Sequence, residues 1–372
     1  MEYKWLENLE SNLLDFMSLL KKDEFSFYPV KKGITKDGAD LNLGMSCYAL
    51  KIYYMTGNWE TLTQEERKKW GIYINSFQDS VQNFPSNSYI DKDYLKSFRN
   101  FTLLSKIKNL IKRFVNYFKK NSYLLEEEKL ENYIRAETKQ AISTLFQVGL
   151  ENEKPYKNPY ETPVEVYEYL NNLDWTKPWD AGAQFSAMCV FTITQNREGI
   201  GINPSIEELK KFAYSIVDTK TGAFFRGRKP NEKELINGAM KVITGLDWIN
   251  ENVPFPERLI DTCLDIEPYE EGCDIVDLVY VLYMCSKITS YRNEEVIEYL
   301  KKVLEKIEKH YFIDEGGFSY FTNMSQTTYY GVKTSKGENT PDIHGTVLLI
   351  WAISMISELV ELPTSNWKVL KP

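Results

Sequence analysis

The sequence predicts an all-α protein, an (α/α)6 toroid in which six inner helices are surrounded by six outer helices. Two patterns predict this fold. Long, almost wholly apolar segments recur along the chain, and amphipathic segments with one charged face alternate with them. A helix that is apolar all round must be buried on every side, whereas an amphipathic helix buries one face. Because strand-type alternation is scarce and no Gly-, Ser- or Pro-rich linker interrupts the series, we expect a single domain over residues 1–372.

The inner helices are predicted from the apolar segments. The last one, Thr340–Leu359, shows the pattern most clearly, because it is almost wholly apolar after a polar first turn that contains Asp342 and His344. An acid at a helix start is stabilised by the helix dipole. In chain order, the earlier segments of this kind are Gly38–Met55, Asn132–Val148, Trp179–Ile193, Leu235–Ile249 and Gly272–Cys285.

The outer helices are predicted from the amphipathic segments. Some carry start signals, since Thr162 precedes a proline and Ser205 with Glu208 fits a capping box. In chain order, these segments are Leu62–Phe77, Thr162–Leu173, Pro204–Val217, Phe255–Leu264 and Asn293–His310.

An insert at about residues 96–128 differs from the rest of this acidic chain. Its segment Phe98–Lys120 combines a helical apolar stripe with many Lys and Arg residues and no acid, which is typical of a basic amphipathic helix. Three interpretations stay open: the helix packs against the toroid or a partner subunit, rests as a peripheral contact on an anionic membrane, or closes over a phosphorylated or acidic substrate.

Composition limits the function classes. A formal net charge of −8 argues against nucleic acid as a partner, because phosphate binding needs a basic face. The five cysteines form no CxxC pair and lie mostly in apolar runs, which favours reduced thiols. No apolar run reaches the length of a membrane span without a charge. We therefore expect a cytoplasmic protein.

A candidate site is predicted at one rim of the toroid, where the N-terminal ends of parallel inner helices meet. Asp342 precedes His344 by two residues, so we expect it to raise the histidine pKa and suit the imidazole to acid–base catalysis near pH 7. For single acids on these helices, capping is the alternative role. The catalytic candidates are His344, Asp342, Asp274 and Asp180, and the substrate-binding candidates on the helices are Asp40, Arg135, Glu137, Gln184, Asn237, Lys241 and Asp277.

Two loops are expected to reach over this rim. The long polar loop Thr322–Thr340 comes just before the last helix, and long loops without regular structure are often functional. The second loop follows the turn Asp218–Phe225. Further substrate-binding candidates on these loops are Tyr329, Tyr330, Lys333 and Arg226.

Two turns and the last helix together resemble a known superfamily. The turns Asp218–Phe225 (DTKTGAFF) and Ile313–Phe321 (IDEGGFSYF) both place Gly and then an aromatic residue after an outer helix, and the last helix reads Asp-x-His-x-Thr before its apolar run. In these features the chain is similar to terpenoid cyclases and protein prenyltransferase β subunits, over about Gly38–Leu359. The resemblance implies an enzyme that acts on an isoprenoid or lipid-linked substrate by acid–base chemistry. It also implies that zinc, if bound, is held by Glu271, Cys273 and His344. The Asp-x-Asp-Asp motif of the cyclases does not occur.

Other function classes fit the same residues. Paired acids with Arg135, Asn237, His344 and Tyr330 suit a carbohydrate-active lyase, C5-epimerase or glycoside hydrolase that binds a sugar acid and moves a proton. A non-catalytic toroid that binds a partner protein is a third class. A zinc site would need three or four ligands, with Asp274 as another candidate carboxylate, whereas Cys273 can equally be a small buried residue. A dry aromatic cavity would favour the isoprenoid, and a wet polar groove would favour the glycan.

Overall fold

The computed structural model describes residues 3–372 except 82, 100–102, 119–124, 196–202 and 365. This part of the chain is predominantly helical, with 58% helix, sixteen α-helices and a few short strands. The predicted all-α class is therefore confirmed. No helix among the described residues is long and apolar enough to cross a membrane.

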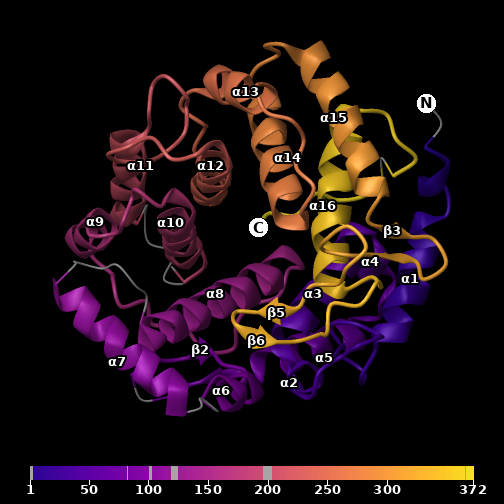
Figure 1. Ribbon diagram of the computed structural model, residues 1–372, viewed down its shortest axis with the longest axis horizontal. Coiled ribbons are helices and arrows are strands. Elements are labelled where there is room, and N and C mark those ends of the chain that lie inside the picture. The colour runs from indigo at the N-terminus through magenta and orange to yellow at the C-terminus, as the bar shows by residue number, and fades with distance from the viewer. Residues whose placement is uncertain (1–2, 82, 100–102, 119–124, 196–202, 365) are drawn as a thin grey trace.

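The helices with buried apolar surfaces contact one another in a closed order, in which the last helix touches the first (Figure 1). α3 touches α8, α8 touches α10, and the contacts continue through α12 and α14 to α16, which touches α3 again. Each of these helices lies at a segment predicted to be an inner helix. They span Leu43–Met55 (α3), Glu126–Gln147 (α8), Pro178–Thr194 (α10), Glu232–Trp248 (α12), Gly272–Ser286 (α14) and Ile343–Leu359 (α16).

The neighbouring helices from α10 through α12 and α14 to α16 run parallel. On α12 and α14, Asn237 bonds to Asp274 and Lys241 lies 3.6 Å from Asp277, so the residue numbers rise together. The same rising order holds for Pro178 with Gly238 and Phe185 with Gly245 between α10 and α12, and for Tyr280 with Trp351 and Tyr283 with Glu358 between α14 and α16. The N-terminal halves of these helices therefore lie towards the same end.

The other helices pack outside this set. α9 contacts α10 and α11, while α13 and α15 cover α14 and α15 also covers α16. Thr63 and Thr162 form capping boxes at α5 and α9, but α11 is capped by Asn203 rather than by the expected Ser205, because the Asn203 side chain accepts from the Ser205 N–H. These elements are α1 (Leu9–Leu20), α2 (Lys36–Asp40), α4 (Asn58–Thr61), α5 (Gln64–Asn75), α6 (Lys92–Arg99), α7 (Leu103–Phe118), α9 (Pro163–Asn171), α11 (Pro204–Ile216), α13 (Pro256–Leu264), α15 (Asn293–Glu308) and a 3-10 helix at Lys4–Leu6.

The predicted helix Gly38–Met55 is divided in two. Asp40 ends the short α2, and α3 begins three residues later. The Asp91 carboxylate, which is distant in sequence, accepts from the backbone N–H groups of Asn42 at 2.8 Å and Leu43 at 3.1 Å. It thereby satisfies donors at the start of α3. The basic insert is also divided, into α6 and α7, and its residues 100–102 and 119–120 lie outside the described residues.

Short antiparallel hairpins connect the helices. β1 (Gln78–Asp79) pairs with β2 (Ser88–Tyr89), β3 (Tyr311–Phe312) with β4 (Gly317–Phe318), and β5 (Thr328–Tyr329) with β6 (Val332–Lys333). In the turn before β4, Gly316 has φ +80°, and a Cβ there would lie 2.1 Å from the Asn12 carbonyl oxygen. Only glycine fits this left-handed position. The β5–β6 hairpin contacts α2 and α6.

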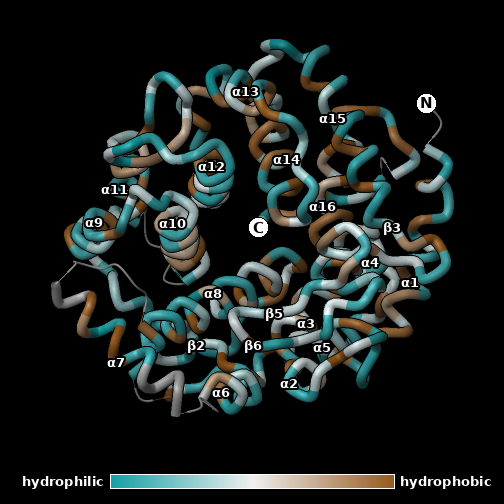
Figure 2. Tube along the Cα trace, in the orientation of Figure 1, coloured by the Kyte–Doolittle hydropathy of each residue, from teal (hydrophilic) through white to brown (hydrophobic). Residues whose placement is uncertain are grey.

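The C-terminal residues cross the C-terminal ends of the closed set of helices, and Figure 1 marks the chain end inside the ring. The Lys368 N–H donates to the Met55 carbonyl oxygen of α3, and the Lys371 N–H donates to Gln147 of α8. The Trp248 indole N–H of α12 donates to the Pro372 carbonyl oxygen at 2.6 Å. Buried apolar side chains from the N-terminal to the C-terminal part of the chain form one continuous cluster, while hydrophobic and hydrophilic residues interleave around the ring in Figure 2.

Candidate functional site

Ionisable side chains from five helices converge inside the ring. Lys241 of α12 contributes to lowering the pKa of His344 on α16 and of Lys139 on α8, although α12 is adjacent to neither helix in the closed order. Lys51 of α3 acts on the same two groups. We call these converging residues the interior cluster; its members are Lys51, Glu137, Lys139, Lys241, Asp277 and His344.

His344 is the cluster member contributed by α16. Its ring stacks on Tyr48, with centroids 4.9 Å apart and planes 10° apart, and lies 5.2 Å from Tyr320. Its Nδ1 is buried and has no hydrogen-bond partner among the described residues. Burial, together with repulsion from Lys51 and Lys241, lowers the histidine pKa to about 4. His344 is therefore neutral at pH 7, and the expected upward pKa shift from Asp342 does not occur.

Asp342 faces the backbone instead of the histidine ring. Its Oδ1 accepts from the N–H of Gly345 at 2.7 Å, and its Oδ2 accepts from the N–H groups of Tyr320 at 2.8 Å and Gln326 at 3.0 Å. The residue is 1% exposed, and burial raises its pKa to about 6 against the opposing effect of these bonds. Asp342 thus ties the start of α16 to the loop before it, and we assign it a structural role.

Glu137 of α8 is a buried carboxyl group with an unusually high proton affinity. Tyr329 donates to its Oε1, whereas its Oε2 has no partner among the described residues. Burial raises the Glu137 pKa to about 8, Tyr329 opposes the rise, and Asp91 adds to it. Glu137 is therefore mostly protonated at pH 7 and is able to donate a proton.

Two further carboxyl groups lie on α14. Asp277 is 3.6 Å from the Lys241 ammonium, its Oδ2 is unpartnered among the described residues, and burial raises its pKa to about 6. Asp274 accepts from Asn237 at 2.7 Å and pairs with Lys233 at 2.5 Å. Asn237 and Asp274 were both site candidates, and the structure joins them to each other across the α12–α14 contact.

The residues considered for zinc do not form a ligand set. Cys273 is half-buried, and burial raises its thiol pKa to about 12. The Glu271 carboxylate is half exposed and lies 3.7 Å from Lys233. The described residues contain no group of three or more His, Cys, Asp and Glu side chains that could hold a metal ion. We therefore derive no zinc chemistry from Cys273, His344 and Glu271.

The β5–β6 hairpin inserts one tyrosine into the ring. Tyr329 is 5% exposed and packs edge-on against Tyr48, while Tyr330 is 48% exposed and packs against Tyr133 at 5.3 Å. A Cβ at Gly44 of α3 would lie 2.2 Å from the Tyr329 hydroxyl oxygen. A glycine on α3 is thus what lets Tyr329 reach Glu137.

We expect Gly44→Ala to lower stability by about 1–3 kcal/mol, because overpacking would displace Tyr329. Urea denaturation of a double-mutant cycle with Tyr329→Ala measures the coupling. The glycine substitution should cost much less in the Tyr329→Ala background. Equal costs in both backgrounds would contradict the contact.

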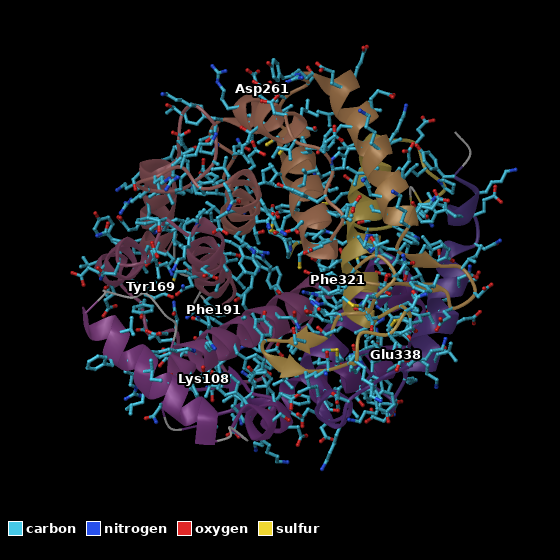
Figure 3. All side chains as sticks on the ribbon, viewed as in Figure 1. Lys108, Tyr169, Phe191, Asp261, Phe321 and Glu338 are labelled. Atoms are coloured by element: carbon cyan, nitrogen blue, oxygen red, sulfur yellow. The ribbon has the colours of Figure 1, made fainter. Side chains whose placement is uncertain are left out.

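A cleft of about 640 Å³ lies beside the interior cluster, between α8, α9 and α10. Tyr160 and Tyr169 stack with centroids 4.1 Å apart, and the Tyr169 hydroxyl donates to Gln184 at 2.7 Å. Figure 3 labels Tyr169 and Phe191 on this wall. Other lining residues are Glu131, Asn132, Asn158, Asn172, Asp174 and Lys177.

Three predicted site residues line this cleft: Asp180, Arg135 and Gln184. Asp180 is exposed, its carboxylate has no hydrogen-bond partner among the described residues, and partial enclosure raises its pKa. Burial also raises the pKa of Tyr160, Tyr169 and Tyr330, and Arg135 opposes the rise in all three. Arg135 therefore connects the cleft that it lines to the hairpin residue Tyr330, which also interacts with Glu137 of the interior cluster.

Three candidates lie apart from both regions. Asp40 is exposed at the end of α2. The inner helix α3 is capped by Asp91 and not by Asp40. Lys333 is exposed on β6. Arg226 bonds to Asn171 at 2.7 Å and stacks over Phe212 in the outer layer.

The sequence reasoning missed Lys51 and Lys139 as site candidates. Each is the only lysine in the apolar part of its helix, α3 or α8, and that isolation is the signal that could have identified them. Their convergence with Lys241 depends on how the helices are arranged around the ring, which spacing within one helix does not reveal.

Some basic side chains of helix α7 form ion pairs with acidic residues of the same chain. Lys112 pairs with Glu126 at 3.1 Å and Arg113 pairs with Glu127, while Leu110 and Phe114 are exposed by 69% and 67%. The ion pairs attach α7 to the start of α8. The expectation of a membrane contact stays a prediction.

Comparisons with protein-family models, with curated proteins and with solved structures found no match to this chain. Inferences about function therefore rest on the side chains and their arrangement.

Proposed function

We propose that the chain is an (α/α)6 toroid and a carbohydrate-active enzyme of the glycoside hydrolase type, with a glycan bound in the cleft between α8, α9 and α10. The closed order of α3, α8, α10, α12, α14 and α16, with α10 to α16 parallel, supports the toroid. The composition of the cleft supports the glycan. The helices α9, α11, α13 and α15 alternate along the chain with helices of the closed set and pack outside them, as the outer layer of such a fold would.

The observation that carries the glycan proposal is the combination of stacked tyrosines with hydroxyl-binding side chains in one cleft. Sugar rings pack their C–H faces on aromatic rings, and their hydroxyls bond to carboxylates and amides. Tyr160 and Tyr169 supply the aromatic surface, and Asn158 and Asn172 supply amides. The volume of about 640 Å³ lies within the range of about 300–1,000 Å³ typical of small-molecule sites.

An isoprenoid substrate is less well supported than a glycan. An isoprenoid chain needs a dry apolar wall, but this cleft carries Glu131, Arg135, Asp174, Lys177 and Asp180. Burying these groups against a hydrocarbon would remove their hydration without replacing it. The terpenoid cyclase- or prenyltransferase-like reaction therefore stays the second candidate.

Two carboxyl groups in the cleft have pKa values shifted in opposite directions. Partial enclosure raises the pKa of Asp180, whereas hydrogen bonds from Thr176, together with Lys177, lower that of Asp174. Opposite shifts in neighbouring carboxyl groups separate a general acid from a base or nucleophile. Asp180 accordingly protonates the leaving-group oxygen, and the ionised Asp174 activates water or attacks the anomeric carbon.

Incubation with a panel of neutral and acidic glycans, followed by assay of new reducing ends, tests this proposal. Asp180→Asn and Asp174→Asn should each lower turnover by about a hundredfold or more, while calorimetry shows glycan binding retained. Tyr169→Ala should instead weaken binding, and Asp314→Asn, at an exposed outer position, serves as the matched control. Failure of the wild type to bind any glycan, or full turnover in Asp180→Asn, would refute the assignment.

A further inference from the structure

Three lysines of the interior cluster, Lys51, Lys139 and Lys241, have no acidic side chain in close contact that balances their charge. Among the described residues, neither Lys51 nor Lys139 forms an ion pair or a side-chain hydrogen bond, although Glu137 attracts Lys51 at longer range, and Lys241 has Asp277 at 3.6 Å. Surface lysines elsewhere in the described chain often pair at closer range, as Lys306 does with Glu270 at 2.6 Å. Unpaired cations inside a protein are costly unless a ligand or water meets them.

The positions of these lysines bring their charges together. They come from α3, α8 and α12, and each keeps a solvent-exposed fraction although it lies within the ring; the Lys241 side chain is 26% exposed. Burial lowers the pKa of Lys51 and of Lys139, and repulsion from the other lysines lowers both further. The three lysines are thus enclosed by the ring and are still partly accessible to solvent.

Few anionic groups lie beside the three lysines. Glu137 is mostly protonated at pH 7, for the reason given above, so Asp277 is the main anion next to the lysines. Three buried polar atoms of the cluster, Glu137 Oε2, Asp277 Oδ2 and His344 Nδ1, have no partner among the described residues. A ligand that is anionic and also accepts hydrogen bonds would compensate the lysines and the protonated carboxyl group.

We propose that the interior cluster binds an oxyanion group, a carboxylate, sulfate or phosphate, and that this group belongs to the glycan in the cleft. The second half rests on the proposed function, whereas oxyanion binding itself does not. Arg135 lines the cleft, and the exposed Tyr330 interacts with both Arg135 and Glu137 of the cluster, so these two residues connect the parts of the site that would hold the two parts of the substrate. The enzyme would accordingly prefer an acidic glycan to a neutral one.

Oxyanion binding is tested by thermal unfolding and calorimetry of the full chain. Inorganic phosphate, sulfate and glucuronate are each compared with chloride at equal ionic strength, which shows which of the three oxyanion groups binds. We expect at least one of these ions to raise the melting temperature above the chloride value. Lys51→Met/Lys139→Met should weaken its binding at least tenfold, and Lys302→Met, at an exposed position, should not change it. Each single lysine variant, with less risk to folding than the double variant, should weaken binding by a smaller factor.

Equal responses to all three ions and chloride, or unchanged binding in the double variant, would reduce the cluster to an adventitious ion site only and overturn the proposal. The glycan half is tested separately with matched acidic and neutral oligosaccharides. We expect the acidic one to bind at least tenfold more tightly, with the preference lost in the double variant. Equal binding would overturn the link to the cluster while leaving the proposed function intact. Oxyanion binding without any glycan binding would overturn the proposed function and leave the ion site standing.

Discussion

Asp342→Ala is expected to lower the free energy of unfolding by about 3–6 kcal/mol. The carboxylate accepts hydrogen bonds from three backbone N–H groups, those of Tyr320, Gln326 and Gly345. Each buried donor left without an acceptor costs about 1–3 kcal/mol. The loss also removes the N-cap of α16 and the attachment of the preceding loop.

Urea denaturation measures this effect, and Asp342→Asn is the informative companion. An amide keeps one acceptor oxygen of similar shape, so the asparagine variant should lose less stability than the alanine variant. The result expected from the sequence alone was different, because Asp342 was predicted to act on His344 as part of a catalytic pair. Unchanged stability in Asp342→Ala, together with lost ligand binding, would support that earlier interpretation and contradict the structural role.

Glu137→Gln is expected to make the protein markedly less sensitive to alkaline pH. The folded-state pKa of Glu137, about 8, lies above its unfolded value of 4.5, so the folded chain holds its proton more tightly. The resulting stability is fully present below pH 4.5 and is lost as the pH rises to 8. At about 1.4 kcal/mol per pKa unit, the total loss is about 5 kcal/mol, with about half of it above pH 6.

Chemical denaturation of both proteins at several pH values between 5 and 9 checks this prediction. The difference in stability between them isolates Glu137, because Asp277 and Asp342, whose pKa values are raised to about 6, titrate in both. Glutamine resembles the protonated glutamic acid and still accepts from Tyr329, so the variant should gain on the wild type as pH rises. Parallel pH profiles for the two proteins would contradict the high pKa, and Glu308→Gln, at an exposed position, controls for the charge change.

The sequence by itself determined most of the buried helices and their order along the chain. Apolar runs predicted α10, α12, α14 and α16 to within a few residues at most of their ends, because an all-apolar helix can only be an inner one. Thr162 and the proline that follows it likewise predicted the start of α9. These signals are local, since they depend on residues one helical turn apart.

Tertiary structure decided which polar groups share a site and in which protonation state. Asp91 caps α3 from a distant segment, which excluded Asp40, and three backbone N–H groups from two segments occupy Asp342. The high pKa of Glu137 and the low pKa of His344 arise from burial and from lysines on other helices. Desolvation and charge interactions act through space, so they depend on which helices become neighbours, and no spacing within a single segment encodes them.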